Sequence, residues 1–302
     1  MLSKLTAVLL IASAAARASV VTDVLGALQN GNFGLADAYI ARYRASFGVT
    51  PEMIEAFSWI GRADLETKQF DKAQTNAEET QRLALEQLKR RKLDAEPHLP
   101  LALGAAIEVR AQVLTIKGDR TGALALLRTE LATYRTTSIA TRLQKNINLL
   151  TLEGKPAPAL DAREFLGARP APLASLRGKP VLLYFWAHWC GDCKTEEPVL
   201  AQIRKEYGNK GLVLIAPTQR YGYARGQEAG PEVELKYIEE VRHVYLADLL
   251  DLATPVSEAN FQAYGASTVP TLVLIDRQGI VRLYHPGVMS LEELRAALNR
   301  LG

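Results

Sequence analysis

The feature that most constrains this chain is a pair of cysteines placed just after a continuous apolar run. Residues 181–186 read Val-Leu-Leu-Tyr-Phe-Trp, and Trp189-Cys-Gly-Asp-Cys193 follows shortly after. An apolar run of this kind predicts a buried strand, and the residues from the cysteines to about Tyr207 are typical of a helix. Cys190 would then lie at the positive end of the helix dipole, where free N–H groups stabilise a thiolate. We therefore interpret Cys190 as a nucleophile.

The second cysteine, Cys193, is expected one helical turn deeper, where it would resolve a mixed disulfide. Two alternatives remain: a purely structural disulfide, or a zinc site that uses His188 with the pair. So short a loop would constrain little of the unfolded chain, and the local sequence lacks a fourth zinc ligand. The chain has only these two cysteines, which is too few for a disulfide-stapled scaffold.

The remainder of the carboxyl-terminal half alternates strand and helix signals. Residues 211–216 predict a second buried strand, and residues 271–275 and 280–284 predict a hairpin around a turn at 277–279. Ser290 with Glu293 forms a capping box for a last helix. This order indicates an α/β fold, which we place at residues 153–302.

Residues 19–152 form a different compositional block, rich in Ala, Leu, Gln, Arg and Glu, with apolar residues at helical spacing. We expect about seven helices and no catalytic group, with its single histidine, His98, exposed. One pattern of a turn, a bulky residue and a later alanine returns at residues 31–36, 68–73 and 118–123. It resembles the turn of a degenerate tetratricopeptide helical hairpin. Such a domain would bind a partner protein on a concave surface; the alternative is a helical bundle without a partner.

The sequence of the amino terminus indicates a targeting segment rather than a folded domain. Residues 1–18 combine a weakly positive start, a short apolar stretch and small residues at Ala16 and Ala18, which indicates a cleaved secretory signal. An uncleaved anchor or an ordinary helix is the alternative. We expect no later stretch to be long and apolar enough to span a membrane, which needs about 20 residues, and hence a soluble periplasmic or secreted protein. The net charge of +3 gives no electrostatic case for nucleic acid.

Four motifs in the second half, taken together, carry a family resemblance. They are Gly154-Lys-Pro-Ala-Pro158, Leu176-Arg-Gly-Lys179, Phe185-Trp-Ala-His-Trp-Cys-Gly-Asp-Cys193 and Thr268-Val-Pro-Thr271. In this order and spacing they resemble the TlpA/ResA-like extracytoplasmic thiol–disulfide oxidoreductases, which have the thioredoxin fold. The resemblance implies that Pro270 is held in cis opposite the cysteines, leaving the backbone of Val269 free to pair with an extended substrate.

Three further positions lie near the cysteines in the sequence, and the same resemblance bears on two of them, Glu196 and Tyr184. Glu196 lies where the family has a glutamate near the cysteines, so it would move a proton when Cys193 attacks; an exposed first-turn acid is the alternative. Tyr184 stands where cytosolic thioredoxins have a buried aspartate. Trp189 is assigned to the substrate-contacting surface, with packing around the site as the alternative.

Residues 217–256 are more than a minimal thioredoxin fold needs. The segment Gln219-Arg-Tyr-Gly-Tyr-Ala-Arg-Gly226 follows a strand end on the expected active-site side of the sheet. Arg and Tyr are favoured in binding contacts, so Arg220 and Tyr221 are candidates for reading substrate. The alternative is a surface insertion followed by a helix at about 232–246.

The leading functional prediction is an enzyme that reduces protein disulfides without a metal or cofactor. Resemblance implies a membrane thiol transporter as its electron donor, and Asp192 between the cysteines predicts a reducing potential. A tetratricopeptide-like adaptor with a vestigial redox domain is the alternative function. A peroxiredoxin-like peroxidase is disfavoured because no Thr-x-x-Cys signature surrounds Cys190.

Overall fold

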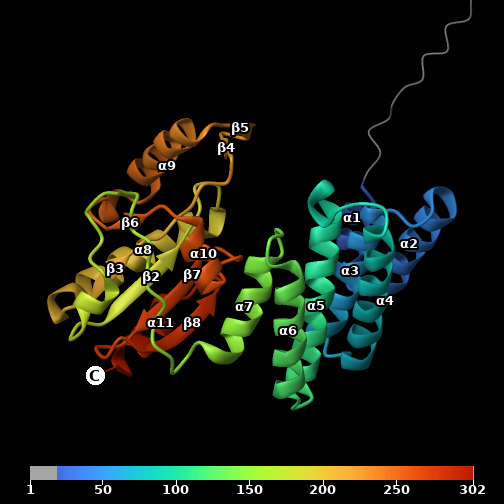
Figure 1. Cartoon of the computed structure of the whole chain (residues 1–302), viewed down its shortest axis with the longest axis horizontal. Helices are drawn as coiled ribbons and strands as arrows, with labels where there is room; N and C mark the ends of the chain where they lie inside the picture. The colour runs from blue at the N-terminus through green and yellow to red at the C-terminus, as the bar shows by residue number, and fades with distance from the viewer. Residues whose placement is uncertain (1–18, 302) are drawn as a thin grey trace, which may run out of the picture. The chain divides into compact units, whose positions relative to one another are not determined.

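The computed structural model describes residues 19–301, and the chain separates into two compact units, Met1–Val109 and Arg110–Gly302. The predicted secretory signal, residues 1–18, lies outside the described residues. The division between the compact units thus falls inside the helical half. The domain boundary at 152/153 rests on the change in composition and stays a prediction. Figure 1 traces the order of the elements along the chain.

Helices account for all the regular structure described before residue 152. They are α1 (Val20–Gln29), α2 (Phe33–Phe47), α3 (Pro51–Glu66), α4 (Phe70–Leu88), the 3₁₀ turn η1 (Leu93–Ala95), α5 (His98–Ile116), α6 (Arg120–Tyr134) and α7 (Ala140–Thr151). The capping chemistry follows the sequence. Thr50 accepts a hydrogen bond from the Met53 N–H, and Pro51 occupies the first turn of α3, where its missing N–H costs nothing.

One backbone turn recurs three times among these helices. Gly31, Lys68 and Gly118 have positive φ angles of 69°, 62° and 87°. In each case the N–H bonds the carbonyl three residues earlier, and the next N–H bonds the carbonyl five residues earlier. This is the paired bonding that closes a helix before a left-handed residue. The alanines that follow are all buried: Ala36, Ala73 and Ala123. The three sequence patterns therefore share one backbone turn. Their assignment to tetratricopeptide repeats stays a prediction.

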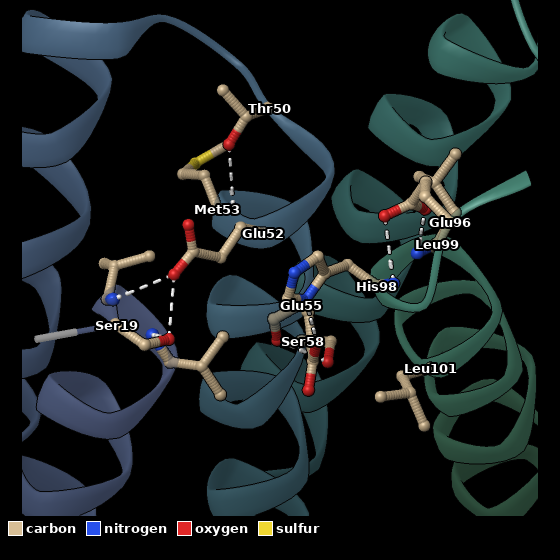
Figure 2. A network of polar contacts seen from close by, with 12 residues as sticks. Ser19, Thr50, Glu52, Met53, Glu55, Ser58, Glu96, His98, Leu99 and Leu101 are labelled. Atoms are coloured by element: carbon tan, nitrogen blue, oxygen red, sulfur yellow. Dashed lines mark hydrogen bonds and ion pairs between the residues drawn. The ribbon is translucent and has the colours of Figure 1, made fainter. Parts of the chain in front are cut away.

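Carboxylate side chains accept hydrogen bonds at the starts of helices in the first unit, as Figure 2 shows. Glu52 accepts from the Ser19 hydroxyl at 2.8 Å and from the Val20 N–H at 3.2 Å, which satisfies the start of α1. His98 is not the isolated exposed residue that the sequence suggested. Its Nδ1 lies 2.6 Å from the Glu55 carboxylate, and only 34% of its side chain is exposed. A partner 43 residues away gives no local signal, which is why the expectation failed.

The second unit is built on a four-stranded sheet in the order β3-β2-β7-β8. Its strands are β2 (Val181–Phe185), β3 (Val213–Ile215), β7 (Thr271–Ile275) and β8 (Val281–Pro286). β2 pairs parallel with β3 and antiparallel with β7, and β7 continues into β8 as the predicted hairpin. This is the thioredoxin fold that the motifs predicted.

Helices cover both faces of that sheet. Alternate residues of β2, such as Leu182 and Tyr184, pack with α8 (Gly191–Tyr207), α9 (Pro231–Tyr245) and α11 (Leu291–Asn299). The other residues, such as Leu183 and Phe185, pack with α10 (Glu258–Tyr264). Side chains alternate across a strand, so a strand buried on both faces is apolar throughout. The capping box of Ser290 and Glu293 starts α11 as expected.

The last helix of the helical half packs within the second unit. Asn148 of α7 donates its side-chain N–H to the Ala263 carbonyl of α10, and the Glu153 carboxylate accepts from the Tyr284 N–H of β8. Gly265 (φ +62°) closes α10 so near to α7 that an added Cβ would lie 2.4 Å from the Lys145 nitrogen. This packing explains why the compact unit extends beyond the α/β region.

Several small elements complete the second unit. They are β1 (Phe165–Leu166), η2 (Leu173–Leu176), η3 (Gly208–Lys210), β4 (Tyr223–Ala224), β5 (Gln227–Glu228), η4 (Ala247–Leu249) and β6 (Thr254–Pro255). β1 pairs with β6, and β4 pairs with β5. The β4–β5 ribbon lies beside α9, at the upper left of Figure 1. The insertion thus contains the helix expected at about 232–246 and a ribbon that the sequence did not indicate.

One expectation about membrane segments was wrong. Among residues 19–301, α5 is the helix long and apolar enough, by length and composition, to cross a membrane, and 61% of that stretch is buried. Leu99, Leu103 and Ile107 on it are fully enclosed. Core burial selects the same apolar side chains as a lipid environment does, so composition alone did not separate the two.

Candidate functional site

The two cysteines lie where β2 gives way to α8, and a disulfide joins them. Cys190 is the N-cap of α8, and its Sγ accepts a hydrogen bond from the Cys193 N–H at 3.0 Å. Both residues are nearly enclosed, with exposed fractions of 3% and 2%. Burial in the disulfide form therefore does not distinguish them. Their positions do: Cys190 has its sulfur at the positive end of the helix, and Cys193 lies within the first turn.

A second segment closes the site from the start of β7. The Val269–Pro270 peptide bond is cis, as the resemblance implied. The Val269 carbonyl oxygen lies 3.4 Å from the Cys190 Sγ, and the Pro270 carbonyl accepts from the Gly287 N–H. The structure thus brings Cys190, Cys193, Val269 and Pro270 together, while their roles in catalysis and substrate pairing stay predictions.

Glu196, three residues after Cys193 on α8, is buried rather than exposed. Its carboxylate, 2% exposed, accepts from the Met289 N–H at 3.2 and 3.3 Å. Burial raises the pKa of Glu196 to about 7, with a further rise from Glu293, although the Met289 N–H opposes it. A carboxyl group that titrates near neutrality is suited to exchanging a proton.

Tyr184 of β2 is buried and close enough to Glu196 to be influenced by its charge. Its hydroxyl donates to the Cys193 carbonyl at 2.7 Å, so this residue anchors the first turn of α8. Burial, with help from Glu196 and Glu197, raises the pKa of Tyr184 well above its usual value. The phenol therefore stays protonated, and it cannot replace the aspartate of cytosolic thioredoxins as a proton acceptor. Glu196 is the neighbouring group whose pKa suits it to accept a proton.

His188, the residue of the alternative zinc site, is a buried side chain that lies against a carboxylate. It is 1% exposed, and its Nε2 lies 3.1 Å from Oε1 of Glu234, which is equally buried. Glu234 lies on α9, 46 residues away, and no sequence signal singled it out. Among residues 19–301, no group of three or more His, Cys, Asp or Glu side chains could hold a metal ion.

The predicted substrate-contacting residues separate into two sets. Trp189 is 46% exposed beside the cysteines, and Tyr221 meets it edge to face with ring centroids 5.4 Å apart. Arg220 points elsewhere: its guanidinium pairs with Glu164 and donates to the Pro231 carbonyl. The Arg220 guanidinium therefore connects the insertion to the residue before β1. Of these predicted substrate-contacting side chains, Trp189 and Tyr221 are the two near the cysteines.

Comparison with known proteins agrees with this geometry. The family model of a thioredoxin-like domain matches residues 172–302. The thioredoxin-like protein YneN of Bacillus subtilis is 28% identical over 150 residues, covering 49% of this chain and 79% of that protein. The thiol:disulfide interchange protein DsbE of Pseudomonas aeruginosa is 31% identical over 148 residues, covering 49% and 73%.

Further relatives bear related names. The thiol-disulfide oxidoreductase ResA of Geobacillus thermodenitrificans is 26% identical over 148 residues, covering 49% of this chain and 77% of that protein. Among solved structures, a thiol:disulfide interchange protein DsbE of Chlorobium tepidum is 27% identical, covering 50% of this chain and 98% of that chain, with a TM-score of 0.39.

Proposed function

Because the chain belongs to the TlpA/ResA-like thiol–disulfide oxidoreductases, the group that includes DsbE and ResA, we propose that it reduces protein disulfides outside the cytoplasm. The observation that carries the proposal is the Cys190–Cys193 pair at the start of α8, next to the cis Val269–Pro270 bond. The test is reduction of insulin by the dithiol form. A chain that reduced neither insulin nor a small disulfide would instead fit the adaptor alternative.

The proposed cycle assigns a role to each buried group. The Cys190 thiolate attacks one sulfur of the substrate disulfide and forms a mixed disulfide, while the other substrate sulfur leaves as a thiolate and takes up a proton. Cys193 then gives its proton to the Glu196 carboxylate and attacks the Cys190 Sγ. The Cys190–Cys193 disulfide closes, the second substrate thiolate leaves, and two electrons have passed to the substrate.

The remaining parts of the proposal concern location and partners. Residues 1–18 would direct the chain across a membrane and be removed, which places the enzyme in the periplasm or outside the cell. A membrane thiol transporter would return the disulfide to the dithiol. The helical region would hold a partner protein, and the thrice-repeated turn with its buried alanines supports this role.

We expect a reducing midpoint potential, below about −200 mV. Asp192 is exposed in the first turn of α8, where its charge disfavours the Cys190 thiolate and so favours the disulfide. Solvent screens that charge, so Asp192→Asn should make the potential less negative by only about 10–20 mV. A titration in dithiothreitol buffers measures both values. A midpoint near −120 mV, or a more negative value for the variant, contradicts the assignment.

We also expect the helical region to select the physiological partner without taking part in the chemistry. A chain that starts at residue 98 lacks α1 to α4 but keeps α7, which packs on α10 and β8. It should reduce insulin at the full-length rate, within about twofold, and lose capture of the native partner in a Cys193→Ser trap. Equal capture by both chains would refute partner binding by α1 to α4.

A further inference from the structure

Glu234 is a buried junction between three segments of the second unit. It lies in the first turn of α9 and is 1% exposed. Its carboxylate accepts from the Tyr221 N–H at 2.5 Å, from the Gly222 N–H at 2.9 Å and from His188 Nε2 at 3.1 Å. One side chain thus connects α9, the segment after β3 and the turn that contains the cysteines.

His188 is the member of this junction that reaches the active-site turn. Its ring meets three tyrosines nearly edge to face, at centroid distances of 5.7 Å for Tyr221, 5.2 Å for Tyr223 and 5.3 Å for Tyr237. Burial lowers the pKa of His188, although Glu234 opposes this. Because Nε2 is the ring nitrogen that faces the Glu234 carboxylate, Nε2 is assigned as the donor of this hydrogen bond. His188 is fixed by rings and one carboxylate, two residues before Cys190.

Tyr221 connects this junction to the exposed surface. The Glu234 carboxylate accepts from the Tyr221 N–H, and the Tyr221 ring contacts both His188 and Trp189. Trp189 is the half-exposed side chain that adjoins Cys190. A path of direct contacts therefore runs from Glu234 through Tyr221 to the indole beside the reactive disulfide. Arg220, whose guanidinium is already paired with Glu164, takes no part in it.

We propose that Glu234 and His188 are positioning residues that make the enzyme selective for protein disulfides. They hold Tyr221 against Trp189, so the indole stays in place as one wall for a polypeptide entering beside Val269. A small disulfide needs access to Cys190 and little of this wall. The inference rests on the proposed function and deepens it, because it assigns substrate choice to the inserted segment 219–246.

The consequence of removing the junction follows from burial. In Glu234→Ala, the buried imidazole N–H of His188 and the backbone N–H groups of Tyr221 and Gly222 would lose their acceptor, so residues 219–226 should move toward water to satisfy them. Tyr221 would then leave Trp189. Glu234→Gln keeps one acceptor oxygen, enough for the Tyr221 N–H and His188 Nε2, but sets an amide donor against the Gly222 N–H, so it should recover part of the wild-type behaviour.

The test compares reduction of insulin and of glutathione disulfide by the full chain. Glu234→Ala should lower kcat/KM for insulin about tenfold, mainly through KM, and change that for glutathione disulfide by at most about twofold. The midpoint potential of the cysteines should stay unchanged. Tyr221→Ala, which keeps the Glu234 contacts, should reproduce the loss. Glu232→Ala, an exposed acid in the same turn of α9, is the matched control.

Three results would overturn the inference. Equal losses with both disulfides, or a shifted potential, would mean that the junction acts on the chemistry or on the fold. Unchanged selectivity in Glu234→Ala and Tyr221→Ala would mean that the segment does not read substrate. Should Glu234→Ala fail to fold, Tyr221→Ala decides alone. A wild-type chain inactive on both disulfides would refute the proposed function instead, so the two failures are distinguishable.

Discussion

Replacement of Cys190 by serine should reduce disulfide exchange to the rate of dithiothreitol alone. Its sulfur is the one at the N-cap of α8, where it accepts the Cys193 N–H and lies 3.4 Å from the Val269 carbonyl. Without that sulfur no mixed disulfide can form there. Cys193→Ser should instead accumulate the mixed disulfide, because the attack that resolves it is missing. Insulin turbidity and non-reducing gels with intact-mass analysis measure the two outcomes.

The control for this pair is that serine is nearly isosteric with cysteine, so each variant should match the dithiol form of the wild type in thermal unfolding. The assignment is reversed if the Cys190→Ser chain captures substrate through Cys193. Such a result would require Cys193, 2% exposed within the first helical turn, to be reached by a polypeptide.

Replacement of Glu196 by glutamine should slow the resolution step about 100-fold and remove its pH dependence near neutrality. In the wild type, burial raises the pKa of Glu196 to about 7, so the carboxylate that accepts the Cys193 proton forms as the pH rises through that value. The rate of closure of the mixed disulfide should rise over the same range. Rapid-quench measurement between pH 5.5 and about 8.5 tests this, with Glu197→Gln, the half-buried neighbour, as the matched variant.

The raised pKa of Glu196 also predicts a pH effect on stability. Between about pH 4.5, where the unfolded carboxyl loses its proton, and about pH 7, the folded disulfide form binds more protons than the unfolded chain. The free energy of unfolding should therefore fall as the pH rises through this window, by about 3 kcal/mol. Glu196→Gln has no such proton and should lack the fall. Denaturant titrations at several pH values would contradict the assignment if the two chains lost stability in parallel.

The local parts of this protein follow from the sequence because their causes are local. The apolar run at 181–185 is a strand buried on both faces, and Cys190 and Cys193 begin the next helix as expected. Ser290 and the thrice-repeated turn likewise formed the predicted cap and helix ends. Periodicity and capping depend on neighbours within about one turn, so the chain itself carries that information.

The partners of buried polar groups were decided by the tertiary structure alone. His188 meets Glu234 across 46 residues, His98 meets Glu55 across 43, and Arg220 is taken by Glu164. One family-derived position also depended on the tertiary structure: Glu196 is a buried acid because Met289 and the core enclose it. A buried charge or hydrogen-bonding group needs a partner, but which partner reaches it depends on how distant elements pack. No periodicity in the sequence records that choice.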